Sequence, residues 1–334
     1  GDTSGKFTYK PVDKKTNYVK RCVGIAGDSL EMKDGYFYIN GKKNILPDRA
    51  KLQFYYTYEA KEPITKSTYP KFLIKKGRTG VYKILSKYWN DSRVQKSITE
   101  NGRLSKIGSD SLYTEVAGGI NPDFARKLKM INVDTKININ LTEEEAARLQ
   151  KQPLTASVTK VNHGVDNAIF PHVEKLGWSQ DNFGPIYIPE AGVTVKLDSE
   201  SLPFYEQIIK NHENNDLQVV GENIYINGKK ADSYTFKQDY FYLIGDNRHN
   251  SLDGRYWGYV PFDHVLGKPV MVWFSWDANA ATFGEKLKSI RWDRMFTTVH
   301  GEGKPVSYRY FVLALIGLYF GYSFYKGKKK PTKK

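Results

Sequence analysis

The feature that most constrains the fold is a strand–turn–strand pattern that the chain contains twice. Residues 28–43, DSLEMKDGYFYINGKK, align without a gap to residues 215–230, NDLQVVGENIYINGKK. In each copy, apolar residues flank a turn that contains glycine, which is typical of a β-hairpin. Two hairpins of one kind and a local duplication both explain the likeness. In either case, the pattern predicts antiparallel β structure in two separate parts of the chain.

Just before the first hairpin, residues 18–25 read as a strand with a lysine on its apolar face. Alternation places Lys20 beside Tyr18, Cys22 and Gly24. A lysine that loses hydration in this way favours its neutral form, which keeps a lone pair. A neutral amine beside a serine is the general base of Ser–Lys catalysis, which needs neither histidine nor aspartate.

The second unusual stretch is FYLIGDNRHNSLDGRYWGYVP, residues 241–261. An apolar strand ends at Gly245, and polar or charged side chains then fill most of positions 246–255. An ordinary surface turn is the alternative, because Gly, Asn, Asp and Ser all favour turns. This loop, however, lies between aromatic strands and contains two sets of Asp and Arg that can neutralise each other. A partly buried loop requires such internal pairing.

Composition excludes several classes of function. The net charge of +15 suggests nucleic acid or a membrane surface as a partner, but six of the lysines lie in residues 326–334. Motifs of nucleic-acid-binding domains are missing, so we expect no nucleic-acid partner. A single cysteine, Cys22, excludes an internal disulfide, and the six histidines show no metal-binding spacing. We therefore predict no metal site and no cofactor.

Together, YVKRCVGIAGD (18–28) and GDNRHNSLDGRYWGYVP (245–261) resemble two motifs of the type I signal peptidases. These membrane-bound Ser–Lys endopeptidases remove signal peptides from exported proteins, and the motifs are their lysine box and their GDNRxNSxDSRxWGxVP box. The resemblance covers about 1–43 and 182–277. It implies a mainly β fold, in which a coiled antiparallel sheet forms a partly open barrel with an inserted α+β region.

The resemblance also implies roles for individual residues. Lys20 is the expected general base, and Ser251 is expected to hydrogen-bond its amine and orient it. Tyr18 and Cys22 should help to desolvate the lysine. Arg21 is expected to pair with Asp246, and Asp253 with Arg255. The implied scaffold of the site consists of Tyr18, Arg21, Asp246, Asn247, Arg248, Asp253 and Arg255.

The chain departs from the family pattern at three points. His249 stands where the family usually has Asp, and Gly254 where it usually has Ser, so we expect altered loop packing with intact chemistry. The family's nucleophile lies in a Ser-Met-x-Pro motif upstream of the lysine, and no methionine here follows a serine. We therefore expect that this chain lacks its first helix and its nucleophile, and that it is inactive as it stands.

The C-terminal part contains an uncharged stretch of sixteen residues, 310–325, between Arg309 and Lys326. As a helix it would rise about 24 Å, against about 30 Å of hydrocarbon in a bilayer. Snorkelling of the flanking cations and interfacial tyrosines could make up the difference, so we predict a transmembrane helix. A buried or interfacial helix is the alternative. A cytoplasmic lysine tail would place residues 1–309 on the periplasmic or extracellular side of a bacterial inner membrane.

These observations predict the organisation of the chain. A split catalytic core comprises 1–43 and 182–277, and an inserted domain comprises 44–181. Within the insertion, LTEEEAARLQ should form a helix, because Thr142 and Glu145 make a capping box. A linker with an amphipathic helix (278–309), the transmembrane helix (310–325) and a basic tail (326–334) follow.

The expected function is signal-peptide removal. The expected partners are signal peptides with small residues at the first and third positions before the cut, the lipid bilayer and a secretion translocon. One alternative is a non-catalytic homologue that binds signal peptides or assists secretion. Another is a LexA-like self-cleaving repressor, which the missing DNA-binding module and the apolar C-terminal segment disfavour.

Overall fold

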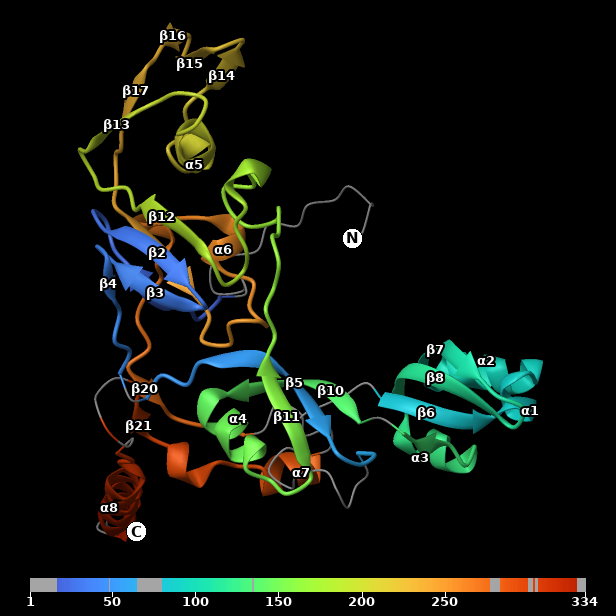
Figure 1. Cartoon of the computed structure of the whole chain (residues 1–334). Helices are drawn as coiled ribbons and strands as arrows, with labels where there is room; N and C mark the ends of the chain where they lie inside the picture. Colours follow the sequence, from blue (N-terminus) through green and yellow to red (C-terminus); the bar gives the residue numbers. More distant parts are fainter. Residues whose placement is uncertain are drawn as a thin grey trace. The chain divides into compact units, whose positions relative to one another are not determined.

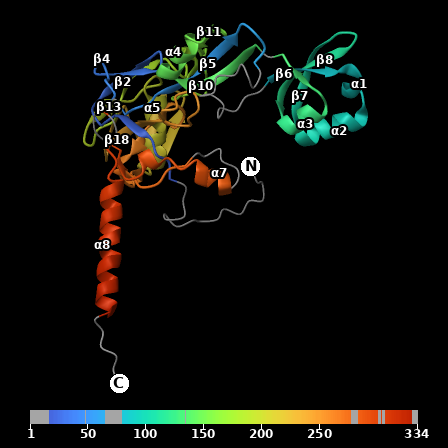
Figure 2. The same cartoon turned by 90° about the horizontal axis from the view of Figure 1, so that it is seen from below.

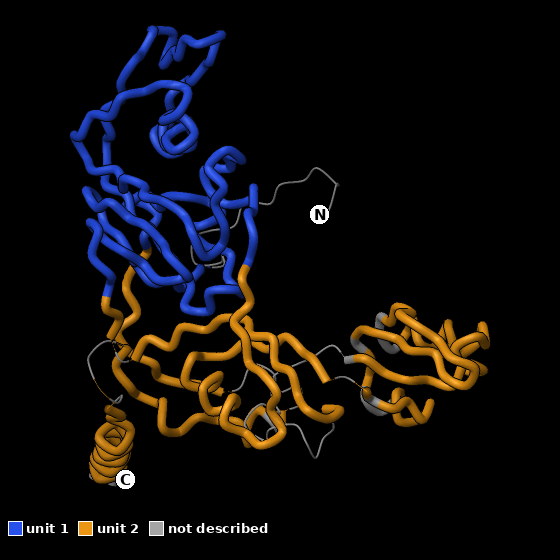
Figure 3. Tube along the Cα trace, viewed as in Figure 1, with its two compact units in different colours: residues 1–44, 163–265 blue, residues 45–162, 266–334 orange. Residues whose placement is uncertain are grey.

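The computed structural model describes residues 17–47, 49–64, 80–133, 135–276, 283–299, 303 and 306–328. The chain forms two compact units (Figure 3). Unit 1 comprises Gly1–Asn44 and His163–Val265, and unit 2 comprises Ile45–Asn162 and Leu266–Lys334. Residues 163–181, which we assigned to the insertion, thus belong to unit 1. The predicted functional division into core and insertion stays a prediction.

Unit 1 is built from antiparallel sheets, and the two that carry the core are short (Figure 1). One contains β1 (Arg21–Gly24), β18 (Tyr240–Ile244) and β19 (Val260–Pro261). The other has the order β12-β2-β3-β4, with β12 at Phe183–Tyr187, β2 at Ser29–Lys33, β3 at Tyr36–Ile39 and β4 at Lys42–Lys43. Leu30, Ile186 and Tyr242 from these sheets lie in one buried apolar cluster. The burial of such strands is the main stabilising contribution to the unit.

The rest of unit 1 consists of small elements. Strand β13 (Thr194–Lys196) pairs with β17 (Ser233–Thr235). Helix α5 (Leu202–Gln207) continues into a π-helical turn at Ile208–His212, and α6 (Gly254–Trp257) follows the polar loop. Single 3₁₀ turns occur at Glu174–Leu176 and Phe262–His264.

The repeated hairpin is confirmed in atomic detail. Strands β14 (Leu217–Val220), β15 (Asn223–Ile226) and β16 (Lys229–Lys230) repeat the order of β2, β3 and β4. In the first copy the Asn40 side chain accepts a hydrogen bond from Ser29 N at 2.8 Å, and in the second Asn227 accepts one from Asp216 N at 2.9 Å. Both asparagines have φ of 51°, a left-handed conformation that asparagine tolerates. The same turn chemistry therefore produces the same hairpin twice.

The strand that carries the lysine motif differs from the prediction. Strand β1 begins only at Arg21, and its register on β18 shifts between Cys22 and Gly24. Because this irregularity interrupts the alternation, Val23 and Gly24 are both buried whereas Cys22 is exposed. The predicted apolar face of Tyr18, Cys22 and Gly24 is therefore wrong.

Unit 2 contains a three-stranded sheet of order β10-β5-β11, with β5 at Gln53–Ala60, β10 at Lys136–Thr142 and β11 at Thr155–Lys160. Every second residue of β5 is buried, and so are Ile137, Ile139 and Leu141 of β10. Helix α4 (Glu143–Gln150) packs against this sheet through Ala146 and Leu149 (Figure 1). The alternation has period two in the strands, so the buried residues form one face.

A second part of unit 2 is an α+β region. Its sheet has the order β7-β8-β6-β9, with β6 at Gly80–Leu85, β7 at Gly102–Ser109, β8 at Tyr113–Ile120 and β9 at Ile131–Asn132. Helices α1 (Ser86–Trp89), α2 (Ser92–Asn101) and α3 (Pro122–Lys127) accompany it. Ile84, Ile98 and Val116 form its buried centre.

The predicted capping box of α4 is confirmed and gives a quantitative expectation. Thr142 Oγ1 accepts from Glu145 N at 3.2 Å, and Glu145 Oε2 accepts from Thr142 N at 2.9 Å. Replacing Thr142 by alanine should lower the free energy of unfolding of unit 2 by about 1 kcal/mol, because a helix N-terminal donor loses its acceptor. Urea denaturation measures this change, and Thr142→Ser, which keeps the hydroxyl, serves as the control. An unchanged midpoint for Thr142→Ala would show that the cap contributes nothing.

The C-terminal residues form β20 (Met271–Val272), α7 (Phe283–Lys288), a 3₁₀ turn (Trp292–Arg294), β21 (Thr297–Thr298) and α8 (Arg309–Lys328). Figure 2 shows α8 as one continuous helix. None of the helices in the described part of the chain is long and apolar enough to cross a membrane. The predicted transmembrane helix at 310–325 is thus not supported, because the uncharged run has only sixteen residues and charged residues flank it at Arg309 and Lys326. The lysines beyond residue 328 lie outside the described residues.

The expectation of a mainly β fold is confirmed. The strand pairs that form sheets in the described residues are antiparallel, and these sheets remain open. The finer expectation, a single coiled sheet that partly closes on itself, stays a prediction.

Candidate active site

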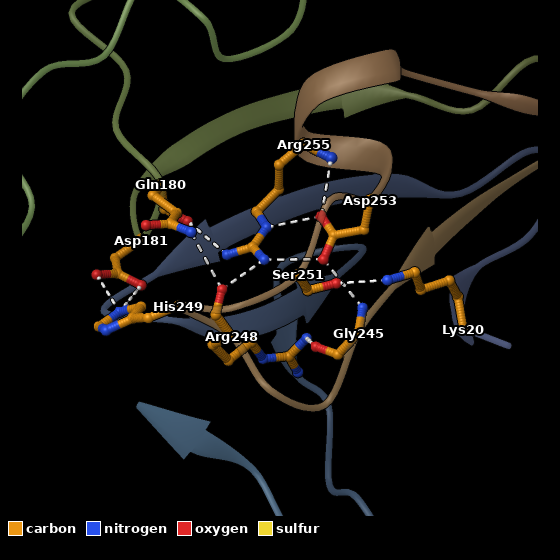
Figure 4. Close-up of polar contacts among 9 residues, drawn as sticks. All are labelled: Lys20, Gln180, Asp181, Gly245, Arg248, His249, Ser251, Asp253 and Arg255. Carbon is orange, nitrogen blue, oxygen red and sulfur yellow. Dashed lines mark hydrogen bonds and ion pairs between the residues drawn. The ribbon is translucent and has the colours of Figure 1, made fainter. Parts of the chain in front are cut away.

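The structure brings Lys20 and Ser251 into direct contact. Lys20 Nζ donates a hydrogen bond to Ser251 Oγ at 2.6 Å, although the two residues are 231 positions apart (Figure 4). The antiparallel pairing of β1 with β18, which aligns Arg21 with Ile244, brings the start of one strand next to the loop that follows the other. Both side chains are half-buried. The hydrogen bond predicted from the sequence is therefore present.

Behind Ser251 lies a carboxylate that is completely buried. Asp253 accepts hydrogen bonds from Arg255 Nε and Nη2, both at 2.8 Å, and from Gly245 N at 3.0 Å. Ser251 Oγ accepts from Lys20 Nζ in front of this buried group. Arg255, Asp253 and Gly245 thus form a hydrogen-bonded network behind the contact between Ser251 and Lys20.

The groups around Asp253 determine its protonation state. Burial by itself would raise the pKa of this carboxyl, but the hydrogen bonds and charge of Arg255, with those of Gly245 N and Ser251, hold it below its usual value. Asp253 is therefore a carboxylate at neutral pH and forms a buried ion pair with Arg255.

A second arginine, Arg248, is also fully buried. Its guanidinium lies 4.9 Å from the centre of the Phe37 ring, and its Nη1 donates to Gly245 O at 3.3 Å. Its carbonyl oxygen accepts from Arg255 Nη2 at 2.6 Å and from Gln180 Nε2 at 3.2 Å. Burial, followed by the positive charge of Arg255, lowers the pKa of Arg248 to about 10. Arg248 thus supports the backbone of the loop from inside.

Arg21 and Asp246 form the second predicted pair. The contact is bidentate, with Nε to Oδ1 and Nη2 to Oδ2 both at 2.7 Å. The side chains are 29% and 35% exposed, so solvent weakens the attraction and the pair mainly fixes geometry. It ties the first residue of β1 to the first residue of the polar loop.

Three other predicted positions contribute less to this contact network. Tyr18 is 69% exposed, and its ring centre lies 5.9 Å from Lys20 Nζ. The Cys22 thiol donates to Gly24 O of its own strand at 3.3 Å. Asn247 is half-buried, and its carbonyl accepts from Asn250 N at 3.1 Å. The role of these residues as site scaffold stays a prediction.

Steric crowding explains why position 254 is a glycine. A Cβ built at this position would lie 3.0 Å from Leu243 O and 3.3 Å from the Tyr242 ring. A larger residue therefore requires these neighbours to shift. The expectation that this loop packs differently from the family pattern stays a prediction.

Sequence reasoning missed the residues around His249. Its Nε2 contacts both carboxylate oxygens of Asp181 at 2.9 Å, and both residues are buried. The ring of His163 lies against His249 with 4.4 Å between ring centres. His163 and Asp181 are 86 and 68 positions from His249, so local spacing did not reveal the group. The one available clue was that His249 replaces the aspartate of the family motif.

Comparison with known proteins identifies the family. The family model described as "Signal peptidase, peptidase S26" matches residues 7–95 and 194–276. A curated relative named "Signal peptidase I" from Helicobacter pylori (strain J99 / ATCC 700824) is 31% identical over 121 residues, which cover 34% of this chain and 41% of the relative. Proteins of the same name match from Buchnera aphidicola subsp. Acyrthosiphon pisum (54% identical over 43 residues, 13% of each chain) and Aquifex aeolicus (38% over 42 residues, 13% of this chain and 16% of the relative).

The match is limited in extent. The aligned region spans about two fifths of the length of the Helicobacter relative. No solved structure matches the chain. The family model nevertheless matches more than half of the residues, including both motifs that form the contact between Lys20 and Ser251. The chain therefore belongs to the signal peptidase family, peptidase S26.

Proposed function

We propose that this chain provides the general base and its positioning network for the removal of signal peptides by a Ser–Lys mechanism. The observation that carries the proposal is the 2.6 Å hydrogen bond between Lys20 Nζ and Ser251 Oγ. Family membership supports peptide-bond hydrolysis. The buried hydrogen bonds of Asp253 with Gly245 and Arg255, behind Ser251, support a lysine of fixed orientation.

In the proposed mechanism, a serine hydroxyl attacks the carbonyl of the scissile bond while neutral Lys20 takes its proton. Lys20 then passes the proton to the leaving amine, and water hydrolyses the acyl-enzyme with Lys20 again as the base. Ser251 acts as a positioning residue. Its Oγ accepts a hydrogen bond from Lys20 Nζ, so the amine keeps one orientation.

We assign no nucleophile within residues 1–334, because no serine here precedes a methionine. The proposed substrates are exported preproteins with small residues at the first and third positions before the cut. We further propose that the bilayer and the secretion translocon are partners at the bacterial inner membrane. No cofactor is part of this mechanism.

The proposal is tested with a fusion in which a Ser-Met-x-Pro segment from a relative precedes residue 1. We expect the fusion to cleave a preprotein after an Ala-x-Ala sequence and the 334-residue chain alone to leave it intact. Cleavage by the chain alone would place the nucleophile within it. A folded fusion that binds the preprotein without cleaving it would support the non-catalytic homologue instead.

Gly245 provides a steric test that removes no polar group. A Cβ at this position would lie 2.1 Å from Ser251 Oγ and 3.4 Å from Lys20 Nζ. Gly245→Ala should therefore displace Ser251 and lower the cleavage rate of the fusion by about 10²-fold, the order expected for a misplaced catalytic group. Gly164→Ala is the matched control, because open space surrounds that position. Equal rates for the two variants would mean that the position of Ser251 is unimportant.

A further inference from the structure

Three side chains that the proposed mechanism does not use meet near the polar loop. His163, Asp181 and His249 come from separate segments of unit 1, and their ligand atoms all lie within 4.8 Å of one another. Figure 4 shows Asp181 and His249 pointing toward each other, with His249 on the loop that also carries Ser251. In the described part of the chain, no other group of three His, Cys, Asp or Glu side chains converges in this way.

The contact between His249 and Asp181 provides a hydrogen-bond partner for only two of the three side chains. His249 is 8% exposed and Asp181 3%, and their hydrogen bonds to each other match the requirement of buried polar groups. His163 Nε2, however, is buried and has no hydrogen-bond partner among the described residues. A buried imidazole nitrogen without a partner is unfavourable, and a bound cation would provide one.

The chemistry of the three donors indicates the kind of ion. Two imidazole nitrogens and one carboxylate suit Zn²⁺ and similar transition metals, whereas Mg²⁺ and Ca²⁺ prefer oxygen ligands. At bond lengths of about 2.1 Å, two ligands of a tetrahedral ion lie about 3.4 Å apart, so the most distant pair, at up to 4.8 Å, needs to close by as much as about 1.4 Å.

We propose that His163, Asp181 and His249 form a binding site for one divalent transition-metal ion of the Zn²⁺ type. Three protein ligands leave a fourth position for water. The ion would cross-link three segments of unit 1 that meet at the polar loop, since His249 is two residues from Ser251 and Gln180, next to Asp181, donates to Arg248 O. Its expected effect is to stabilise unit 1, and the site is independent of whether the chain cleaves signal peptides.

The test uses the 334-residue chain purified without a histidine tag and treated with a chelator. Titration with ZnCl₂ in a calorimeter should show one ion per chain, and zinc should raise the melting temperature. Substituting Co²⁺ should give the visible absorption of a tetrahedral or five-coordinate site. MgCl₂ and CaCl₂ at the same concentration should produce neither effect.

His163→Ala is the decisive variant, because this residue is half-exposed and its Nε2 has no partner to lose among the described residues. We expect its zinc affinity to fall by more than about 100-fold, since loss of even an outer-sphere partner reduces affinity about 10–100-fold. His249→Ala should show the same loss, with circular dichroism to verify folding.

The control is His264→Ala. His264 also lies against a second histidine, His212, with 5.6 Å between ring centres, and its ring nitrogen contacts Asp263 at 2.7 Å. His264, His212 and Asp263 are thus the same residue types as the proposed site, but their ligand atoms do not converge on one point. Removal of the His264 side chain should therefore leave zinc binding unchanged. Unchanged binding in His163→Ala, loss of binding in His264→Ala, or no zinc binding by the unmodified chain would each overturn the proposal.

Discussion

Replacing Lys20 by methionine should lower the rate of signal-peptide cleavage by the Ser-Met-x-Pro fusion by about 10²–10⁴-fold, the contribution typical of a general base. Methionine keeps an unbranched, apolar side chain but removes the amine that contacts Ser251 Oγ. Because only the base is lost, kcat should fall while the affinity for the preprotein is kept. Steady-state cleavage of a purified preprotein measures both quantities.

Two further variants make this result specific. Lys175→Met is the matched control, because this lysine lies on the surface of unit 1, where it pairs with the exposed Glu200. The rate of this variant should equal that of the fusion. Ser251→Ala should reduce the rate less than Lys20→Met, because the base is kept and only its orientation is lost. An unchanged rate for Lys20→Met would show that the lysine is scaffold, and the non-catalytic homologue would become the better explanation.

Replacing Asp253 by asparagine should lower the free energy of unfolding of unit 1 by about 3–5 kcal/mol. Asp253 and Arg255 are fully buried and joined by two hydrogen bonds of 2.8 Å. Asparagine has a similar shape but no charge, so the Arg255 guanidinium would remain buried without its counter-charge. Urea denaturation followed by tryptophan fluorescence measures the loss.

Asp246→Asn is the control for this prediction. Its pair with Arg21 is about one third exposed, so its loss should cost about 1 kcal/mol or less. Equal losses for the two variants would mean that the burial of Asp253 has no energetic consequence.

The pH dependence of the Asp253→Asn effect follows from the lowered pKa of Asp253. A carboxyl whose pKa is lower in the folded state stabilises the fold above its unfolded pKa of about 3.9, and this contribution disappears as pH falls through the folded value. The stability difference between the unmodified chain and Asp253→Asn should therefore be constant near neutral pH and shrink below about pH 4. A difference that grows in acid would contradict the assignment of Asp253 as the stabilising carboxylate.

Local sequence patterns predicted the elements whose geometry depends on neighbouring residues. The likeness of residues 28–43 and 215–230 predicted two hairpins of one kind, and in each copy an asparagine with φ of 51° precedes the glycine of the last turn. The cap at Thr142 likewise depends on residues three positions apart. These interactions are local, so the sequence contains all the information needed to expect them.

The candidate site could be predicted only in part. The two motifs named Lys20 and Ser251, and the pairs of Arg21 with Asp246 and Asp253 with Arg255 are present in the structure. The surroundings of the lysine were predicted wrongly, because a register shift in β1 is a property of its pairing with β18 and leaves no mark on the alternation. The C-terminal helix was predicted to span a membrane from its uncharged run, but that run has only sixteen residues between Arg309 and Lys326.

The sequence by itself determined the family, the two residues of the contact between Lys20 and Ser251, and the local hairpins, since each rests on residue types at short spacing. Only the tertiary structure decided which distant groups meet. The contact between Lys20 and Ser251 requires β1 to pair with β18, and the meeting of His163, Asp181 and His249 requires three segments to pack around one loop. Such contacts depend on how buried strands pair and pack in three dimensions, which no pattern of neighbouring residues encodes.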